Sequence, residues 1–195
     1  MKVLASAVLA IVLAGGAQAA TVATGSTLVG DAGGIDAVGP NVSIASNNAA
    51  YSNEVTTPDS EWVWIGNINT VNAANFEFSF DLTGFDVATA ALEGVWGVDN
   101  FGSISLNGTL IAQLLGNSES NFRSLQAYSD GDLAVFNQGI NTVSYALFDN
   151  AGPAAFRATA IVTADPVSAA VPLPAGGLLL LGALGSLALR RKRKA

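Results

Sequence analysis

Residues 75–84 read NFEFSFDLTG, and this stretch decides the fold. Apolar and polar side chains alternate strictly in it, with Phe76, Phe78, Phe80 and Leu82 at one set of positions and Glu77, Ser79, Asp81 and Thr83 at the other. Because successive side chains of a β-strand point to opposite faces of a sheet, the alternation predicts a strand with one buried and one solvated face. Such strands are typical of antiparallel sheets that cover a core on one side.

The same alternation recurs along the middle of the chain. Residues 140–150 place Val143, Tyr145 and Leu147 on one face, and residues 61–67 and 91–100 read as two more strands. A further strand at 153–165 alternates Ala154, Phe156, Ala158, Ala160 and Val162 with Arg157, Thr159, Ile161 and Thr163. Asn107-Gly108 predicts a type I′ turn between strands at 103–106 and 109–112. About seven to nine short strands predict an all-β domain, an antiparallel β-sandwich or jelly roll, over residues 20–166.

The N-terminal residues 1–19 predict a secretory signal peptide helix. Lys2 precedes an apolar run from Val3 to Leu13, and Ala17-Gln18-Ala19 forms an A-x-A cleavage site. We therefore expect export through the secretion translocon and cleavage by signal peptidase before Ala20.

The C-terminal residues 167–195 predict a membrane-anchoring segment. An apolar stretch at 176–189 would span only about 21 Å as a helix, which is short for a hydrocarbon core of about 30 Å. It is followed by five consecutive cations, Arg190, Arg191, Lys192, Arg193 and Lys194. By the positive-inside rule these cations stay in the cytoplasm, so the segment predicts a transmembrane helix with the domain outside.

The motif before that stretch is Val171-Pro172-Leu173-Pro174-Ala175. Motif, apolar helix and basic end together resemble the VPLPA variant of the PEP-CTERM sorting signals, which belong to exported proteins of Gram-negative bacteria that make extracellular polysaccharide. The resemblance implies an exosortase, a membrane cysteine protease, as partner, with cleavage near Pro174. It also implies a precursor held transiently in the inner membrane and a product at the cell surface or outside the cell.

The charge of the chain is unevenly distributed. The net charge is −7, yet residues 20–170 carry only two cations, Arg123 and Arg157, against all fifteen acidic residues, a net charge of −13. Such a segment repels nucleic acid and anionic lipid. The chain has no cysteine and no histidine, which excludes disulfides, Ser-His-Asp and Cys-His catalysis, and zinc sites built from those residues.

Two groups of residues are candidate ligand sites. Trp62 and Trp64 are two positions apart, so on a strand they would share a face, either as core or as a stacking platform for carbohydrate. The second group is the aspartates of three polar clusters, which serve either as turn residues or as calcium ligands. These aspartates are Asp99, Asp130, Asp132 and Asp149.

Residues 60–163 resemble galactose-binding-like jelly-roll domains. The matching residues are Asp99, Asn100, Leu106, Asn107 and Gly108 in a first hairpin, and Gly139, Asn141 and Val143 in a later turn and strand. The resemblance implies the architecture more than an activity, and such domains often carry a structural calcium.

These observations support three hypotheses about function. The first is a non-enzymatic cell-surface or extracellular-matrix protein associated with exopolysaccharide and requiring no cofactor. The alternative is a carbohydrate-binding, lectin-like module. The third is a secreted hydrolase, which would need two facing carboxylates in a cleft, at least one of them strongly desolvated.

Overall fold

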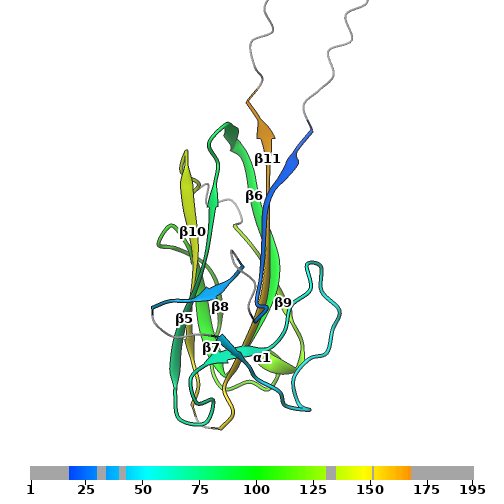
Figure 1. Cartoon of the computed structure of the whole chain (residues 1–195), viewed down its shortest axis with the longest axis vertical. Coiled ribbons are helices and arrows are strands. Elements are labelled where there is room, and N and C mark those ends of the chain that lie inside the picture. The colour runs from blue at the N-terminus through cyan, green and yellow to red at the C-terminus, as the bar shows by residue number, and fades with distance from the viewer. Residues whose placement is uncertain (1–17, 30–33, 40–42, 131–134, 151, 168–195) are drawn as a thin grey trace, which may run out of the picture.

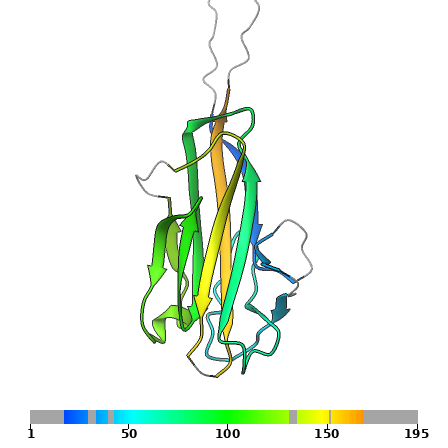
Figure 2. The same ribbon diagram turned by 90° about the vertical axis from the view of Figure 1, so that its left-hand side faces the viewer.

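The computed structural model describes residues 18–29, 34–39, 43–130, 135–150 and 152–167. Two antiparallel sheets pack face to face in it, which confirms the predicted all-β sandwich (Figures 1 and 2). The six-stranded sheet contains β1 (Ala20–Ser26), β3 (Ser43–Ala45), β4 (Val63–Ile65), β6 (Phe85–Asp99), β9 (Gln126–Ser129) and β11 (Ala155–Pro166). The five-stranded sheet contains β2 (Asp36–Ala37), β5 (Ala73–Asp81), β7 (Phe101–Leu106), β8 (Thr109–Leu114) and β10 (Ile140–Phe148).

The strand order of the larger sheet is β3-β4-β11-β6-β9, with β1 also paired to β11, and that of the smaller sheet is β2-β5-β10-β7-β8. The described residues thus form eleven strands, more than the predicted seven to nine. The surplus lies in very short strands such as β2 and β3, which their Gly-, Ser- and Asn-rich surroundings did not reveal. A four-residue helix, α1 (Ser120–Arg123), lies between β8 and β9.

The core lies between the sheets and follows the predicted alternation. Along β5 every second residue is buried, and the phenylalanines face small side chains of β11 such as Ala158 and Ala160. The rings of Phe76 and Phe156 lie 5.0 Å apart across the core. A Cβ on Gly25 of β1 would lie 2.6 Å from the ring of Phe78, so only glycine fits at this position. Buried core side chains occur only between residues 35 and 164 of the described chain, so the domain contains its own core.

Two turn motifs of the galactose-binding-like resemblance contact each other. Asn107 and Gly108 both have positive φ, as a type I′ turn requires, and they join β7 to β8 as predicted. Buried Asn141 accepts a hydrogen bond from the Asn107 side-chain amide at 2.8 Å and donates to the carbonyls of Asn137 and Gly139. These residues therefore fix the fold at the edge of the five-stranded sheet.

The first strand begins and the last strand ends at the same end of the sandwich. β1 pairs antiparallel with β11, with Ala20 opposite Ala164 (Figure 1). The first and last residues of the domain therefore lie at the same end of the sandwich, and the connection between β10 and β11 lies at the opposite end. The predicted sorting motif, apolar helix, basic end and most of the signal peptide, including Ala17, lie outside the described residues, whereas Ala19 and Ala20 lie within them. No helix in the described ranges is long and apolar enough to cross a membrane.

Candidate ligand-binding site

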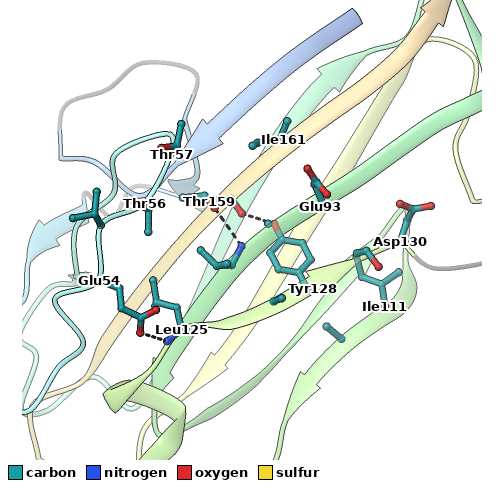
Figure 3. Close-up of a pocket in the computed structure, with 16 residues that line it drawn as sticks. Glu54, Thr56, Thr57, Glu93, Ile111, Leu125, Tyr128, Asp130, Thr159 and Ile161 are labelled. Carbon is teal, nitrogen blue, oxygen red and sulfur yellow. Dashed lines mark hydrogen bonds between the residues drawn. The ribbon is translucent and has the colours of Figure 1, made fainter. Parts of the chain in front are cut away.

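An open depression of about 810 Å³ lies on the outer face of the six-stranded sheet (Figure 3). Its floor consists of outward-facing residues of β6 and β11, namely Glu93, Val95, Thr159 and Ile161. The loop of residues 54–57 forms one wall, and residues 125–130 at and around β9 form the other, where Ile111 and Ala112 of β8 in the five-stranded sheet also contribute. We call this site the acidic depression, because Glu54, Glu93 and Asp130 line it and no lysine or arginine does.

The loop wall is held in place by a buried arginine. Arg157 points outward from β11, where it donates from Nε to Ser60 Oγ at 2.9 Å and from its terminal nitrogens to the carbonyls of Ser52 and Glu54, at 3.2 and 2.8 Å. Burial lowers the pKa of Arg157, while the charges of Glu54 and Asp59 act in the opposite direction. Since a guanidinium stays protonated in proteins, this cation anchors the loop over the sheet.

A second, smaller apolar cluster lies beneath the same loop. Tyr51, Trp62 and Ala155 are buried there, with Phe122 and Leu125 packed against them. The Trp62 ring passes over Gly97 of β6, where a Cβ would lie 2.8 Å from the indole. This cluster covers part of the outer face of the sheet, and Arg157, which points outward from β11, is buried beside it, since Arg157 and the Trp62 indole both donate to the Ser52 carbonyl.

Of the two alternatives for Trp62 and Trp64, the structure supports the core, and the two rings form no stacking platform. Trp62 is 8% exposed and Trp64 is fully buried, and their indole nitrogens donate to the carbonyls of Ser52 and Val71. The two rings also belong to different apolar clusters, because β4 begins only at Val63 and Trp62 precedes it. Neither ring therefore offers a flat face to a ligand.

The floor of the depression is built around Gly94. Pairing between β6 and β11 is interrupted there, and a Cβ on Gly94 would lie 2.0 Å from the Thr159 carbonyl oxygen. The Tyr128 hydroxyl occupies the gap and donates to that oxygen at 2.8 Å, while the Val95 N–H donates to Thr159 Oγ1 at 3.2 Å. Burial raises the pKa of Tyr128, so its hydroxyl stays protonated and serves as a fixed structural donor.

Two of the carboxylates in the depression are oriented by the backbone. Glu54 Oε1 accepts from the Leu125 N–H at 2.9 Å and from Ser52 Oγ at 2.7 Å, and these hydrogen bonds lower the pKa of Glu54. Asp130 Oδ1 accepts from the Leu92 N–H at 2.7 Å. The site therefore presents fixed hydrogen-bond acceptors that suit a ligand rich in hydroxyl donors, and it repels anions.

The aspartates predicted as calcium ligands do not form one site. Asp99 and Asp149 are buried near each other at the far end of the sandwich, while Asp130 lines the depression and Asp132 lies outside the described residues. Asp99 already accepts hydrogen bonds from Tyr51 and Asn100. In the described ranges no group of three or more acidic residues is placed to hold a metal ion, so calcium at any single cluster, where amide and carbonyl oxygens would complete the set of ligands, stays a prediction.

Several lining residues were not identified from the sequence, among them Glu54, Glu93 and Thr159. They come from separate parts of the chain and share no motif. The only local signal was the glycine at position 94 within a strand, which can mark a close backbone approach.

Comparison with known proteins finds only solved structures of low similarity to this chain. No family model matches the chain, and no curated protein matches it. A family 35 carbohydrate-binding module from an environmental isolate is similar in structure, with a TM-score of 0.41 and 14% identity over 74% of this chain and 97% of that one. CBM35 from Cellvibrio japonicus Abf62 has a TM-score of 0.37 and 15% identity, covering 78% and 100%.

A Stig cyclase, Fisc from Fischerella sp. TAU, is similar to the same degree, with a TM-score of 0.39 and 14% identity, covering 75% of this chain and 100% of that one. Values this low do not place the chain in any of these groups.

Proposed function

We propose that this chain is an exported, non-catalytic cell-surface or matrix protein that binds extracellular polysaccharide in the acidic depression. The observation that carries the proposal is the lining of this site, an open hollow with carboxylates oriented by backbone N–H groups and with no lysine or arginine. Polysaccharides supply many hydroxyl donors, and an open hollow accommodates a polymer that continues beyond the site.

The same geometry supports binding rather than hydrolysis. The paired buried carboxylates of Asp99 and Asp149 do not line the depression, and Asp99 is engaged by Tyr51. The proposal also includes export, transient anchoring in the membrane and processing by an exosortase. This part is supported by the sequence of residues 167–195.

Affinity electrophoresis tests the proposal. Residues 20–170 are run in native gels that contain hydroxyethylcellulose, laminarin, xylan or galactomannan. We expect retardation in at least one gel, and we expect Glu93→Arg to reduce it by placing a large cation on the floor of the site. Glu119→Arg is the matched control, because it makes the same charge change at an exposed residue outside the depression. Equal mobility of the wild-type protein in all gels would refute the proposal.

A further inference from the structure

The outer face of the five-stranded sheet carries an aromatic pair with one exposed member. Phe148, at the end of β10, is 44% exposed and stacks on Phe101 of β7, with ring centroids 5.5 Å apart and planes inclined by 15°. Phe101 is half-buried, and the tryptophans, tyrosines and other phenylalanines of the described chain are buried or half-buried, so Phe148 is the one exposed aromatic residue of the described chain. Exposed aromatic groups of this kind are informative, because burial would otherwise be favourable.

Rows of hydroxyl groups extend from this pair along the same face. Strand register places Ser144 opposite Ser105, and Thr142 opposite Ser79. Ser79 Oγ and Thr142 Oγ1 are 3.2 Å apart, and Ser144 Oγ donates to Glu77 at 3.4 Å. The distance along β10 from Phe148 to Thr142 is about 20 Å, at roughly 3.4 Å per residue.

We infer that this face, here called the serine face, is a second binding surface for polysaccharide. A sugar ring has an apolar face, which the phenylalanine pair can contact, and a rim of hydroxyls, which the serines, Thr142 and Glu77 can bond. The two arginines in the described part of the chain, Arg123 and Arg157, lie on other elements, so nothing on this face favours a nucleic acid or an anionic lipid.

The serine face is poorly suited to pairing with a second copy of the chain. A stable interface buries about 800 Å² on each partner and is apolar at its centre. Here the middle of β10 carries small hydroxyl groups with Glu77 beside them, and the exposed apolar side chains are scattered: Phe148 at one end, Ile140 at the other, and Leu110 on β8 opposite Ser105.

Two sites on opposite outer faces would let one domain bridge two polysaccharide chains. The two sheets lie face to face (Figure 2) with the core between them; the acidic depression lies on the outer side of the six-stranded sheet and extends to β8, and the serine face lies on the outer side of the five-stranded sheet. The bridging role rests on the proposed function, whereas binding at the serine face does not. The phenylalanine pair also lies at the end of the sandwich remote from Ala20 and Pro166 (Figure 1).

The test uses residues 20–170, because the domain contains its own core. Binding to the soluble polysaccharide that retards the protein most is measured by affinity electrophoresis, and cross-linking is measured by light scattering of the mixture. The variants are Phe101→Ala/Phe148→Ala and Ser105→Lys, which puts a long cation amid the hydroxyl rows without changing the phenylalanines. Thermal melts confirm that each variant is folded.

We expect either variant to weaken binding about tenfold and to abolish cross-linking, while retardation through the depression persists. Binding and cross-linking equal to wild type in both variants would overturn the second surface. If the phenylalanine variant loses binding but Glu93→Arg does not, the serine face is a binding surface and the proposal for the depression fails.

Two further outcomes would overturn the inference. A wild-type dimer in sedimentation that the phenylalanine variant converts to monomer would identify the serine face as an interface between copies of the chain. Absence of any binding by the wild-type protein would refute both proposals.

Discussion

At the residue scale, Asp99 links burial to the pH dependence of stability. It is 8% exposed, Oδ2 accepts from the Tyr51 hydroxyl at 3.2 Å, and Oδ1 accepts from the Asn100 side chain. Burial raises the pKa of Asp99 from 3.8 to about 6, the charge of Asp149 acts in the same direction, and the Tyr51 hydrogen bond opposes them. Between pH about 4 and 6 the folded protein therefore binds more protons than the unfolded chain. Its free energy of unfolding falls as the pH rises through this window.

Asp99→Asn should remove this dependence. We expect the variant to gain stability relative to wild type as the pH rises from 4 to 6, and to keep that gain at pH 7 and above, because residue 99 no longer has to ionise in a buried position. Thermal melts of both proteins from pH 4 to 8 measure the difference.

The matched control is Asp81→Asn. Hydrogen bonds from Thr83 lower the pKa of exposed Asp81, so its contribution is present above pH about 4 and is lost as the pH falls. Asp81→Asn should accordingly destabilise the protein at neutral pH. If the difference in melting temperature between wild type and Asp99→Asn stayed the same from pH 4 to 8, the raised pKa of Asp99 would be contradicted.

At the scale of elements, the loop of residues 52–60 depends on β11. Arg157 bonds two carbonyls and a hydroxyl of this loop over a sequence separation of about a hundred residues. Arg157→Lys keeps the charge but loses the planar set of donors, which leaves buried carbonyls without partners. We expect a loss of about 2–4 kcal/mol in the free energy of unfolding, measured by urea denaturation, and faster proteolysis within residues 52–60.

Arg123→Lys is the control for this prediction. Arg123 is exposed on α1 and pairs with Glu119 at 2.9 Å, so the same substitution there should change stability by less than about 1 kcal/mol. An equal effect of the two substitutions would show that Arg157 does not hold the loop.

The strands could be predicted from the sequence and the site could not. Alternation in β5, β10 and β11 marks the core face because one physical cause, burial against the opposite sheet, acts on every second residue. Burial on the outer face of β11 could not be predicted in this way. It depends on the loop of residues 52–60, which is about a hundred residues from Arg157 in the sequence and bonds both Arg157 and Trp62. The spacing of Trp62 and Trp64 predicted a shared face only if both lie on one strand. No local signal shows that β4 begins at Val63, after Trp62.

At the scale of the whole molecule, the charge of the domain predicts which polysaccharides it accepts. Residues 20–170 carry a net charge of −13, and three carboxylates line the depression. We expect neutral polymers to bind with little dependence on salt, and alginate, a polyuronate, not to bind at 20 mM NaCl, because charge repulsion is strongest at low ionic strength. Retardation by alginate that weakens with salt would point instead to a cationic site.

The end of β11 limits the distance between the folded domain and the predicted sorting motif. Pro166 ends β11 beside Ala20, and Val171 follows five residues later, so the motif lies at most about 18 Å from the last strand. Pro174 is eight residues past Pro166, so a membrane protease that cuts near it would work within about 29 Å of the folded sandwich. Deleting residues 167–170 should block maturation by bringing the sandwich against the enzyme, whereas inserting four Gly/Ser residues before Val171 should leave maturation intact.

Immunoblots of membrane and culture fractions would follow chain size in these variants, with Pro172→Ala/Pro174→Ala as the variant that changes the motif itself. Accumulation of the membrane-bound precursor is expected for the deletion and for the proline variant. Normal maturation of the proline variant would contradict the sorting role of the motif. Normal maturation of the deletion alone would show that the end of β11 can open before the chain is cut.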